Sequence, residues 1–92
     1  MSRIAIAGLQ LEGPNGDNLA HMEAEIDVAM RRFPWLDMLL ASELNACGTD
    51  VRRAEPMPGP RENRFCEIAR RHGIWLVPGS MFEAADGVVY NT

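Results

Sequence analysis

The sequence contains no lysine, and all nine of its basic residues are arginine. A polypeptide without lysine cannot form a Schiff base through its own side chains, and it cannot supply the phosphate-binding lysine of a P-loop. Both mechanisms are therefore excluded for any site that is built from these 92 residues alone.

Cysteine is also scarce. Cys47 and Cys66 stand nineteen positions apart, and the chain has no CxxC spacing, which excludes a zinc ribbon and a thioredoxin-like redox pair. We expect both to be reduced cysteines that serve as small hydrophobic residues. The sequence alone leaves a disulfide between them open.

Long hydrophobic runs and an excess of positive charge are missing too. No apolar run approaches the roughly 20 residues of a membrane span, and the N-terminus lacks the pattern of a signal peptide. Thirteen acidic residues give a formal net charge of -4, which disfavours binding to nucleic acid. We therefore expect a cytoplasmic protein with neither a membrane nor a nucleic-acid partner.

The apolar residues that are present predict a βαβαββ order of elements in one α/β unit. Residues 4–9 and 38–41 are short apolar runs typical of buried strands. Between them, apolar residues recur every three or four positions over 18–33, which predicts an amphipathic helix with Asp17 as its N-cap and Pro34 as its stop.

The second half continues this alternation of strand and helix. A second helix is predicted over 65–72, with Pro60 near its first turn and Gly73 as its C-cap. Strands follow at 74–77 and from Val88, after an Asp-Gly turn. Such alternation predicts a parallel sheet buried on both faces, and two helices are thin cover for it. The other face then needs a partner chain or the remainder of a larger domain.

Glu43 is the candidate catalytic residue, because it directly follows a predicted buried strand. Sites in open α/β sheets lie at the carboxyl ends of strands. There a glutamate partly withdrawn from water could act as a general base toward a thiol, a hydroxyl or water. The alternative is a structural carboxylate that caps a helix or pairs with an arginine.

Other candidate groups are weaker. Cys47 lies four residues after Glu43 and would share a helix face with it, but Asn45 and Gly48 favour a loop and hence a structural cysteine. The arginine pairs 52–53 and 70–71 are expected to be solvated. His21 and His72 lack partners at metal-ligand spacing, and the early glycines do not form a GxGxxG motif.

Several short motifs together resemble the N-terminal part of a carbon–nitrogen hydrolase of the nitrilase superfamily. The resemblance covers essentially the whole chain. In order, the matching features are a first strand that ends in Gln10, Asn18-Leu19 at the helix start, a strand that runs into Glu43, the helix 65–72, the strand 74–77 that leads to Gly79, and Gly87-Val88-Val89-Tyr90-Asn91-Thr92.

The resemblance implies that residues 1–92 are the N-terminal segment of a hydrolase domain with a four-layer αββα sandwich. It implies that Glu43 is the general base of a Glu-Lys-Cys triad that acts on an amide or nitrile, without metal or cofactor, in a protein that forms homo-oligomers. Ser42 stands where the family usually has proline. The family's lysine and nucleophilic cysteine come after the last strand of this chain, so we expect the 92 residues alone to be inactive.

Two other classes of function stay open at this stage. The chain could be a truncated or remnant hydrolase module that only binds or assembles with a partner. It could also be a small flavodoxin-like or nucleotide-binding domain, although no phosphate-binding loop is visible in the sequence.

Overall fold

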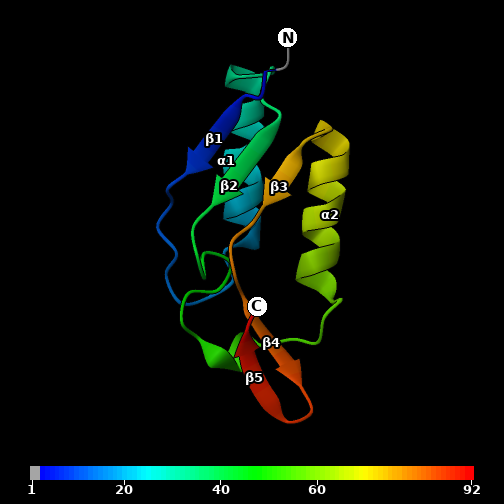
Figure 1. The fold of residues 1–92 in the computed structure, drawn as a ribbon. Helices are drawn as coiled ribbons and strands as arrows, with labels where there is room; N and C mark the ends of the chain where they lie inside the picture. Colours follow the sequence, from blue (N-terminus) through cyan, green and yellow to red (C-terminus); the bar gives the residue numbers. More distant parts are fainter. Residues whose placement is uncertain (1–2) are drawn as a thin grey trace.

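The computed structural model describes residues 3–92 and shows a mixed α/β fold (Figure 1). Seven strands and helices, joined by one short 3₁₀ helix, follow one another along the chain. They are β1 (Ile6–Leu9), α1 (Leu19–Arg32), β2 (Met38–Ala41), the 3₁₀ turn Val51–Arg53, α2 (Pro60–His72), β3 (Trp75–Val77), β4 (Phe82–Ala85) and β5 (Val88–Asn91). The predicted helices and the first three predicted strands are therefore confirmed, with ends that move by a few residues.

β1, β2 and β3 form the predicted parallel sheet, with β2 in the centre. The register aligns Ala7, Leu39 and Leu76 in one row across the sheet. This row faces the helices, and Leu39 is completely buried. The core on this face is continued by Met22, Ile26, Ala29 and Met30 of α1 and by Phe65 and Ile68 of α2.

Local sequence signals explain where the helices begin and end. In α2, Pro60 occupies the first turn, and Gly73 ends the helix in the left-handed conformation, as predicted. The predicted N-cap of α1 was wrong by one residue. Asn18 is the N-cap, while the Asp17 carboxylate accepts a hydrogen bond from the Leu19 amide at 3.2 Å. The side chain of Asn18 makes no capping hydrogen bond, and its amide group donates instead to the carbonyls of Pro14 and Asn45.

The C-terminal part differs from the prediction. β5 does not extend the parallel sheet but pairs with β4 in a separate antiparallel hairpin, and β4 was missed in the sequence. The two-residue turn Asp86-Gly87 has positive φ at both positions, which suits a tight hairpin. β4 has the sequence Phe-Glu-Ala-Ala, a weak strand signal, and it is completed by pairing with Glu55 as well as with β5.

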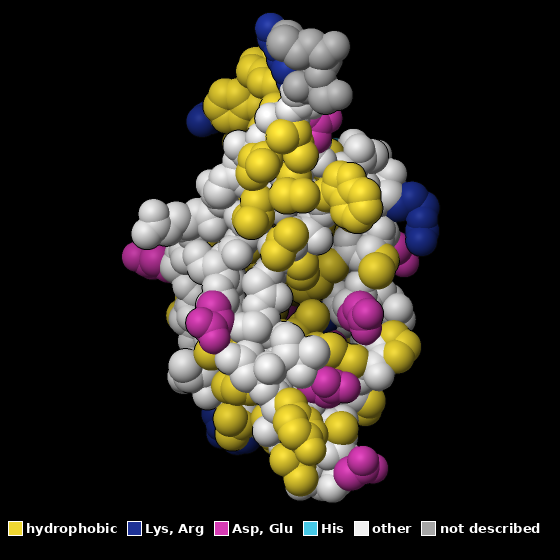
Figure 2. Space-filling model, viewed as in Figure 1, with side chains coloured by type: hydrophobic (Ala, Val, Ile, Leu, Met, Phe, Trp, Pro, Cys, Tyr) yellow, Lys and Arg dark blue, Asp and Glu magenta, His cyan; other side chains and the backbone are white. Residues whose placement is uncertain are grey.

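One face of the parallel sheet is bare. Alternate residues that point away from the helices form two rows across the strands, Ile6–Met38–Trp75 and Gly8–Leu40–Val77. Trp75 is 72% exposed and Ile6 is 55% exposed. Figure 2 shows these apolar side chains gathered over the upper part of the molecule. The two helices thus cover only one face of the sheet. This agrees with the expectation that two helices are too few to cover both faces.

An ion-pair network joins the two helices. Glu23 of α1 accepts hydrogen bonds from Arg64 at 2.6 Å and Arg71 at 3.0 Å, both on α2. Asp27 contacts Arg71 at 2.6 Å and His72 at 2.7 Å. Arg71 is therefore not simply solvated, as its pair with Arg70 had suggested. It links two acidic residues on the neighbouring helix.

The network lowers the pKa of both carboxyl groups. For Glu23, the hydrogen bond from Arg64 is the main cause. For Asp27, burial opposes the shift, but the hydrogen bond from His72 and the charge of Arg71 lower its pKa overall. Both carboxylates therefore stabilise the helix pair in their charged form.

Within residues 3–92, neither helix is long and apolar enough to cross a membrane.

Replacement of Glu23 by glutamine should make the fold less stable and less sensitive to acid. Because the pKa of Glu23 is lower in the folded state, its contribution is complete above the ordinary value of 4.5 and is lost as the pH falls through the folded-state value. Thermal unfolding should show a Tm lower by about 3 °C at pH 7. The difference should shrink at pH 3. Glu25→Gln on the same helix is the control, and an equal loss there would contradict the role of the network.

The bare sheet face should drive self-association of the 92-residue chain, because a large apolar surface is unfavourable in water. Light scattering should detect oligomers or aggregates of the wild type. The double substitution Ile6→Lys and Trp75→Lys should shift the chain to monomer, whereas Val89→Lys on the hairpin should not. A monodisperse wild-type monomer would disprove this prediction.

Candidate functional site

Glu43 lies two residues beyond the end of β2, at the carboxyl edge of the parallel sheet. This is the position that the sequence predicted. The expectation that the side chain is partly withdrawn from water is wrong, because Glu43 is exposed.

Asn91 at the end of β5 is the hydrogen-bond partner of Glu43. Its side-chain Nδ2 donates to Glu43 Oε1 at 2.9 Å. The structural alternative was that Glu43 caps a helix or forms an ion pair with an arginine. Within residues 3–92, Glu43 does neither. A neutral amide from a motif 48 residues further along the chain holds the carboxylate instead.

The backbone around Glu43 is held by the segment that follows β3. Gly79 adopts a φ of +82°, and a Cβ atom placed on it would clash with the carbonyl oxygen of Ser42. Next to this contact, the Leu44 amide donates to the carbonyl of Ser80 at 3.0 Å and to its hydroxyl at 3.2 Å. Leu44 itself has a φ of +55°. The chain thus turns sharply just after Glu43, and Ser80 fixes the turn.

Asparagines hold the other side of the same turn. Asn45 is buried, and its side chain donates to the carbonyl of Leu11 at 3.0 Å. The side chain of Asn18 donates to the carbonyls of Asn45 at 2.9 Å and Pro14 at 2.8 Å. These bonds tie the loop after β1 to the loop after β2. The positioning roles of Asn45 and Asn91 could not be predicted from the sequence, since a single asparagine has no periodicity that reveals its partner.

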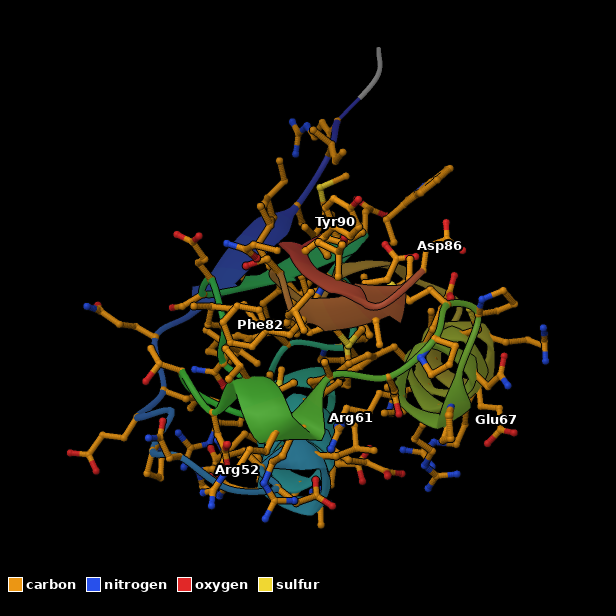
Figure 3. All side chains as sticks on the ribbon, turned by 90° about the horizontal axis from the view of Figure 1, so that it is seen from below. Arg52, Arg61, Glu67, Phe82, Asp86 and Tyr90 are labelled. Carbon is orange, nitrogen blue, oxygen red and sulfur yellow. The ribbon has the colours of Figure 1, made fainter. Side chains whose placement is uncertain are left out.

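The arginines nearest in sequence to the site pair with other acids. Arg52 contacts Asp50 at 2.9 Å, and Arg61 contacts Glu55 at 3.3 Å. In the view from the hairpin end, both arginines lie on the side of the molecule away from Tyr90, the neighbour of Asn91 (Figure 3).

Neither cysteine serves as a partner for Glu43. Cys47 is buried among the core residues, and burial raises the pKa of its thiol, which favours the protonated form. This confirms the structural role predicted for it. Cys66 is instead exposed on α2, and both are free thiols. Cys47 is therefore part of the core, and Cys66 lines the pocket on α2 rather than the surroundings of Glu43.

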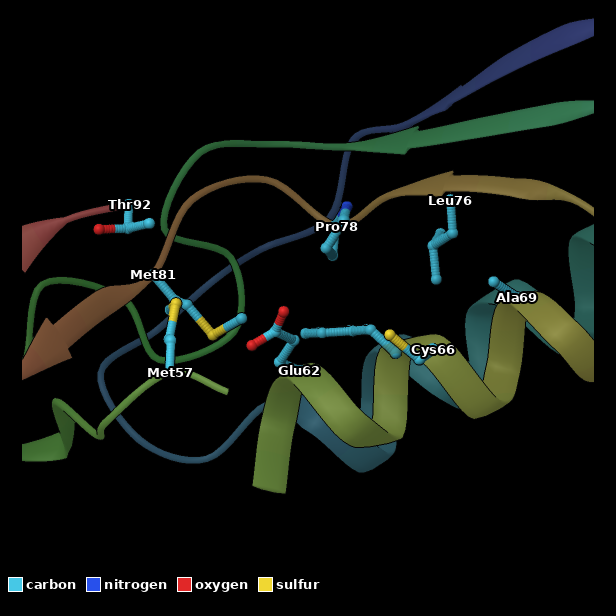
Figure 4. Close-up of a pocket in the computed structure, with 9 residues that line it drawn as sticks. Met57, Glu62, Cys66, Ala69, Leu76, Pro78, Met81 and Thr92 are labelled. Atoms are coloured by element: carbon cyan, nitrogen blue, oxygen red, sulfur yellow. The ribbon is translucent and has the colours of Figure 1, made fainter. Parts of the chain in front are cut away.

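A separate apolar pocket of about 290 Å³ lies between α2 and the segment after β3 (Figure 4). Its lining is mainly apolar and includes the side chains of Glu62 and Cys66. The full lining comprises Met57, Glu62, Phe65, Cys66, Ala69, Leu76, Pro78, Met81 and Thr92. Glu43 is not part of it, so the pocket and the candidate catalytic carboxylate are distinct features.

Metal ligands do not gather at this site. Among residues 3–92, no group of three or more histidine, cysteine, aspartate or glutamate side chains could hold a metal ion. His72 is engaged with Asp27 between the helices and contributes to the fold.

No model of a known protein family matches this sequence, and a search of curated proteins finds no significant match. The residues around Glu43 and their geometry are therefore the basis for a functional proposal.

The contact between Gly79 and Ser42 should make Gly79 irreplaceable. Gly79→Ala adds a methyl group against a backbone carbonyl at positive φ, so we expect a loss of about 3 kcal/mol or more in unfolding free energy. Gly87→Ala is the matched control, because Gly87 has a similar φ of +76° and open space around its Cβ position. It should cost only about 1 kcal/mol. Equal losses in chemical denaturation would show that the contact does not constrain the site.

Proposed function

We propose that this chain is the N-terminal segment of a carbon–nitrogen hydrolase of the nitrilase type, with Glu43 as its general base. The observation that carries the proposal is the convergence of three separate motifs. Glu43 after β2, Gly79 after β3 and Asn91 in the last strand meet at one edge of the sheet. Each motif resembles the family in sequence alone. Their contact at one site would explain why the three motifs occur together in one chain.

The chemistry follows from a carboxylate that is accessible and lacks a charged partner. Glu43 accepts the proton of a cysteine thiol, and the thiolate attacks the carbon of an amide or nitrile. With an amide, a lysine stabilises the tetrahedral species, and the amine or ammonia leaves with a proton. With a nitrile, the attack first gives a thioimidate, and one water must add to it before ammonia leaves and the same thioester forms. Water then hydrolyses the thioester and regenerates the thiol. The lysine and the nucleophilic cysteine must come from a polypeptide segment outside these 92 residues.

The bare sheet face supports the same proposal. Parallel strands are normally covered on both faces, and two sheets pack face to face about 10 Å apart. The rows Ile6–Met38–Trp75 and Gly8–Leu40–Val77 would meet the second sheet of an αββα sandwich. The substrate in this proposal is a small amide or nitrile, and the mechanism needs neither a metal nor a cofactor.

A noncatalytic module is the second candidate function. It is favoured by the absence of lysine and by the exposure of the apolar sheet face, which suits a chain that assembles with a partner. In that case Glu43 and Asn91 would be remnants of an ancestral active site that no longer catalyses a reaction.

The decisive experiment begins with the reading frame after the codon for Thr92. The hydrolase proposal predicts a strand that ends in lysine, followed by a cysteine after another apolar strand. The polypeptide encoded by the longer frame should release ammonia from short aliphatic amides or nitriles, and Glu43→Gln should lower kcat by about 10³-fold or more.

The 92-residue chain is the control for this experiment, since it has the base without a nucleophile. It should release no more ammonia than its own Glu43→Gln variant. A stop codon directly after Thr92, or full activity of Glu43→Gln in the longer protein, would refute the hydrolase proposal.

A further inference from the structure

We propose that Asn91 is a positioning residue, which holds one oxygen of the Glu43 carboxylate and leaves the other free to accept a proton. The inference rests on the proposed role of Glu43 as a general base. It starts from the 2.9 Å hydrogen bond between Asn91 Nδ2 and Glu43 Oε1. Within residues 3–92, Glu43 Oε2 has no hydrogen-bond partner.

The backbones on both sides of this hydrogen bond are anchored to the same short segment. Asn91 pairs with Phe82 in the hairpin, and the next residue, Thr92, exchanges two backbone hydrogen bonds with Met81 at 2.8 and 2.9 Å. The turn after Glu43 is anchored to Ser80 through the Leu44 amide. Residues 80–82 therefore set the separation of the two side chains.

The chemical nature of the donor suits a general base. An arginine at the position of Asn91 would form an ion pair and stabilise the charged carboxylate, which would weaken it as a base. A neutral amide donates one hydrogen bond and adds no charge. Asn91 thus orients the carboxylate without neutralising it. A fixed orientation matters because a displacement of about 1 Å between reacting groups can cost about 100-fold in rate.

The contact can be tested by NMR with selectively ¹⁵N-labelled asparagine in the 92-residue chain that carries Ile6→Lys and Trp75→Lys, the variant expected to be monomeric. The chain has five asparagines, and Asn63 on α2 is the exposed reference. One Nδ2 proton of Asn91 should lie downfield of the Asn63 signals and exchange more slowly with water. Glu43→Ala should remove both differences. Identical behaviour of Asn91 and Asn63 in the monomeric variant without Glu43→Ala would overturn the inference.

A second measurement separates positioning from a purely structural role. In Asn91→Leu, which is close in shape but lacks the donor, the side-chain couplings of Glu43 should change from a single rotamer to an average. The backbone signals of Leu44 and Ser80 should stay in place. Loss of those backbone signals, or an unchanged Glu43 rotamer, would show that Asn91 does not position the carboxylate.

In the longer hydrolase, Asn91→Leu should lower kcat by about 10- to 100-fold with little change in KM, and Asn63→Leu should have no effect. If Glu43→Gln abolishes activity and Asn91→Leu does not reduce it, the positioning role is wrong and the hydrolase proposal stands. If Glu43→Gln leaves activity unchanged, the proposed function fails, and the inference fails with it.

Discussion

The close approach of Gly79 to the carbonyl of Ser42 is the constraint on which the rest of the site depends. Gly79 continues the register in which β3 lies beside β2, and a Cβ atom on it would clash with that oxygen. Directly after this contact, Ser80 accepts hydrogen bonds from the Leu44 amide, and β4 begins at Phe82. The same short segment therefore holds the turn after Glu43 and begins the hairpin that carries Asn91.

The segment from Gly79 to Met81 also marks the boundary between two parts with different stabilisation. On one side, the parallel sheet buries Leu39 under both helices, and the ion pairs around Glu23 tie those helices together. On the other side, the β4–β5 hairpin has largely exposed side chains and is held by its ladder and by the Glu55 pairing. Local opening is easier where little apolar surface is buried. The hairpin end of the Glu43 site should therefore open before the sheet end.

The elements that the sequence predicted correctly are those with local signals. Apolar spacing and the terminal residues Pro60 and Gly73 define the helices, and short apolar runs define β1, β2 and β3. β4 was missed because its composition is a weak strand signal. The segment forms a strand through its pairing with β5 and Glu55.

The site was predicted only in part, and for a related reason. The position of Glu43 follows from a local rule, the end of a buried strand. The contact between Glu43 and Asn91 spans 48 residues and depends on a turn with positive φ at Leu44, which no local pattern indicates. The role of Arg71 between the helices was hidden for the same reason, because a pair of adjacent arginines looks solvated until a second helix lies beside it.

The partners of the arginines are relevant to whether Glu43 has a structural or a catalytic role. A chain with nine arginines has many chances to pair an exposed glutamate with a cation. The ion-paired arginines instead serve other acids, namely Asp50, Glu55, Glu23, Asp27 and Glu67. A structural carboxylate would gain from such a pair, whereas a general base would lose proton affinity through it. Glu43 has instead the neutral amide of Asn91 as its partner among residues 3–92, which is compatible with the proposed role as a general base.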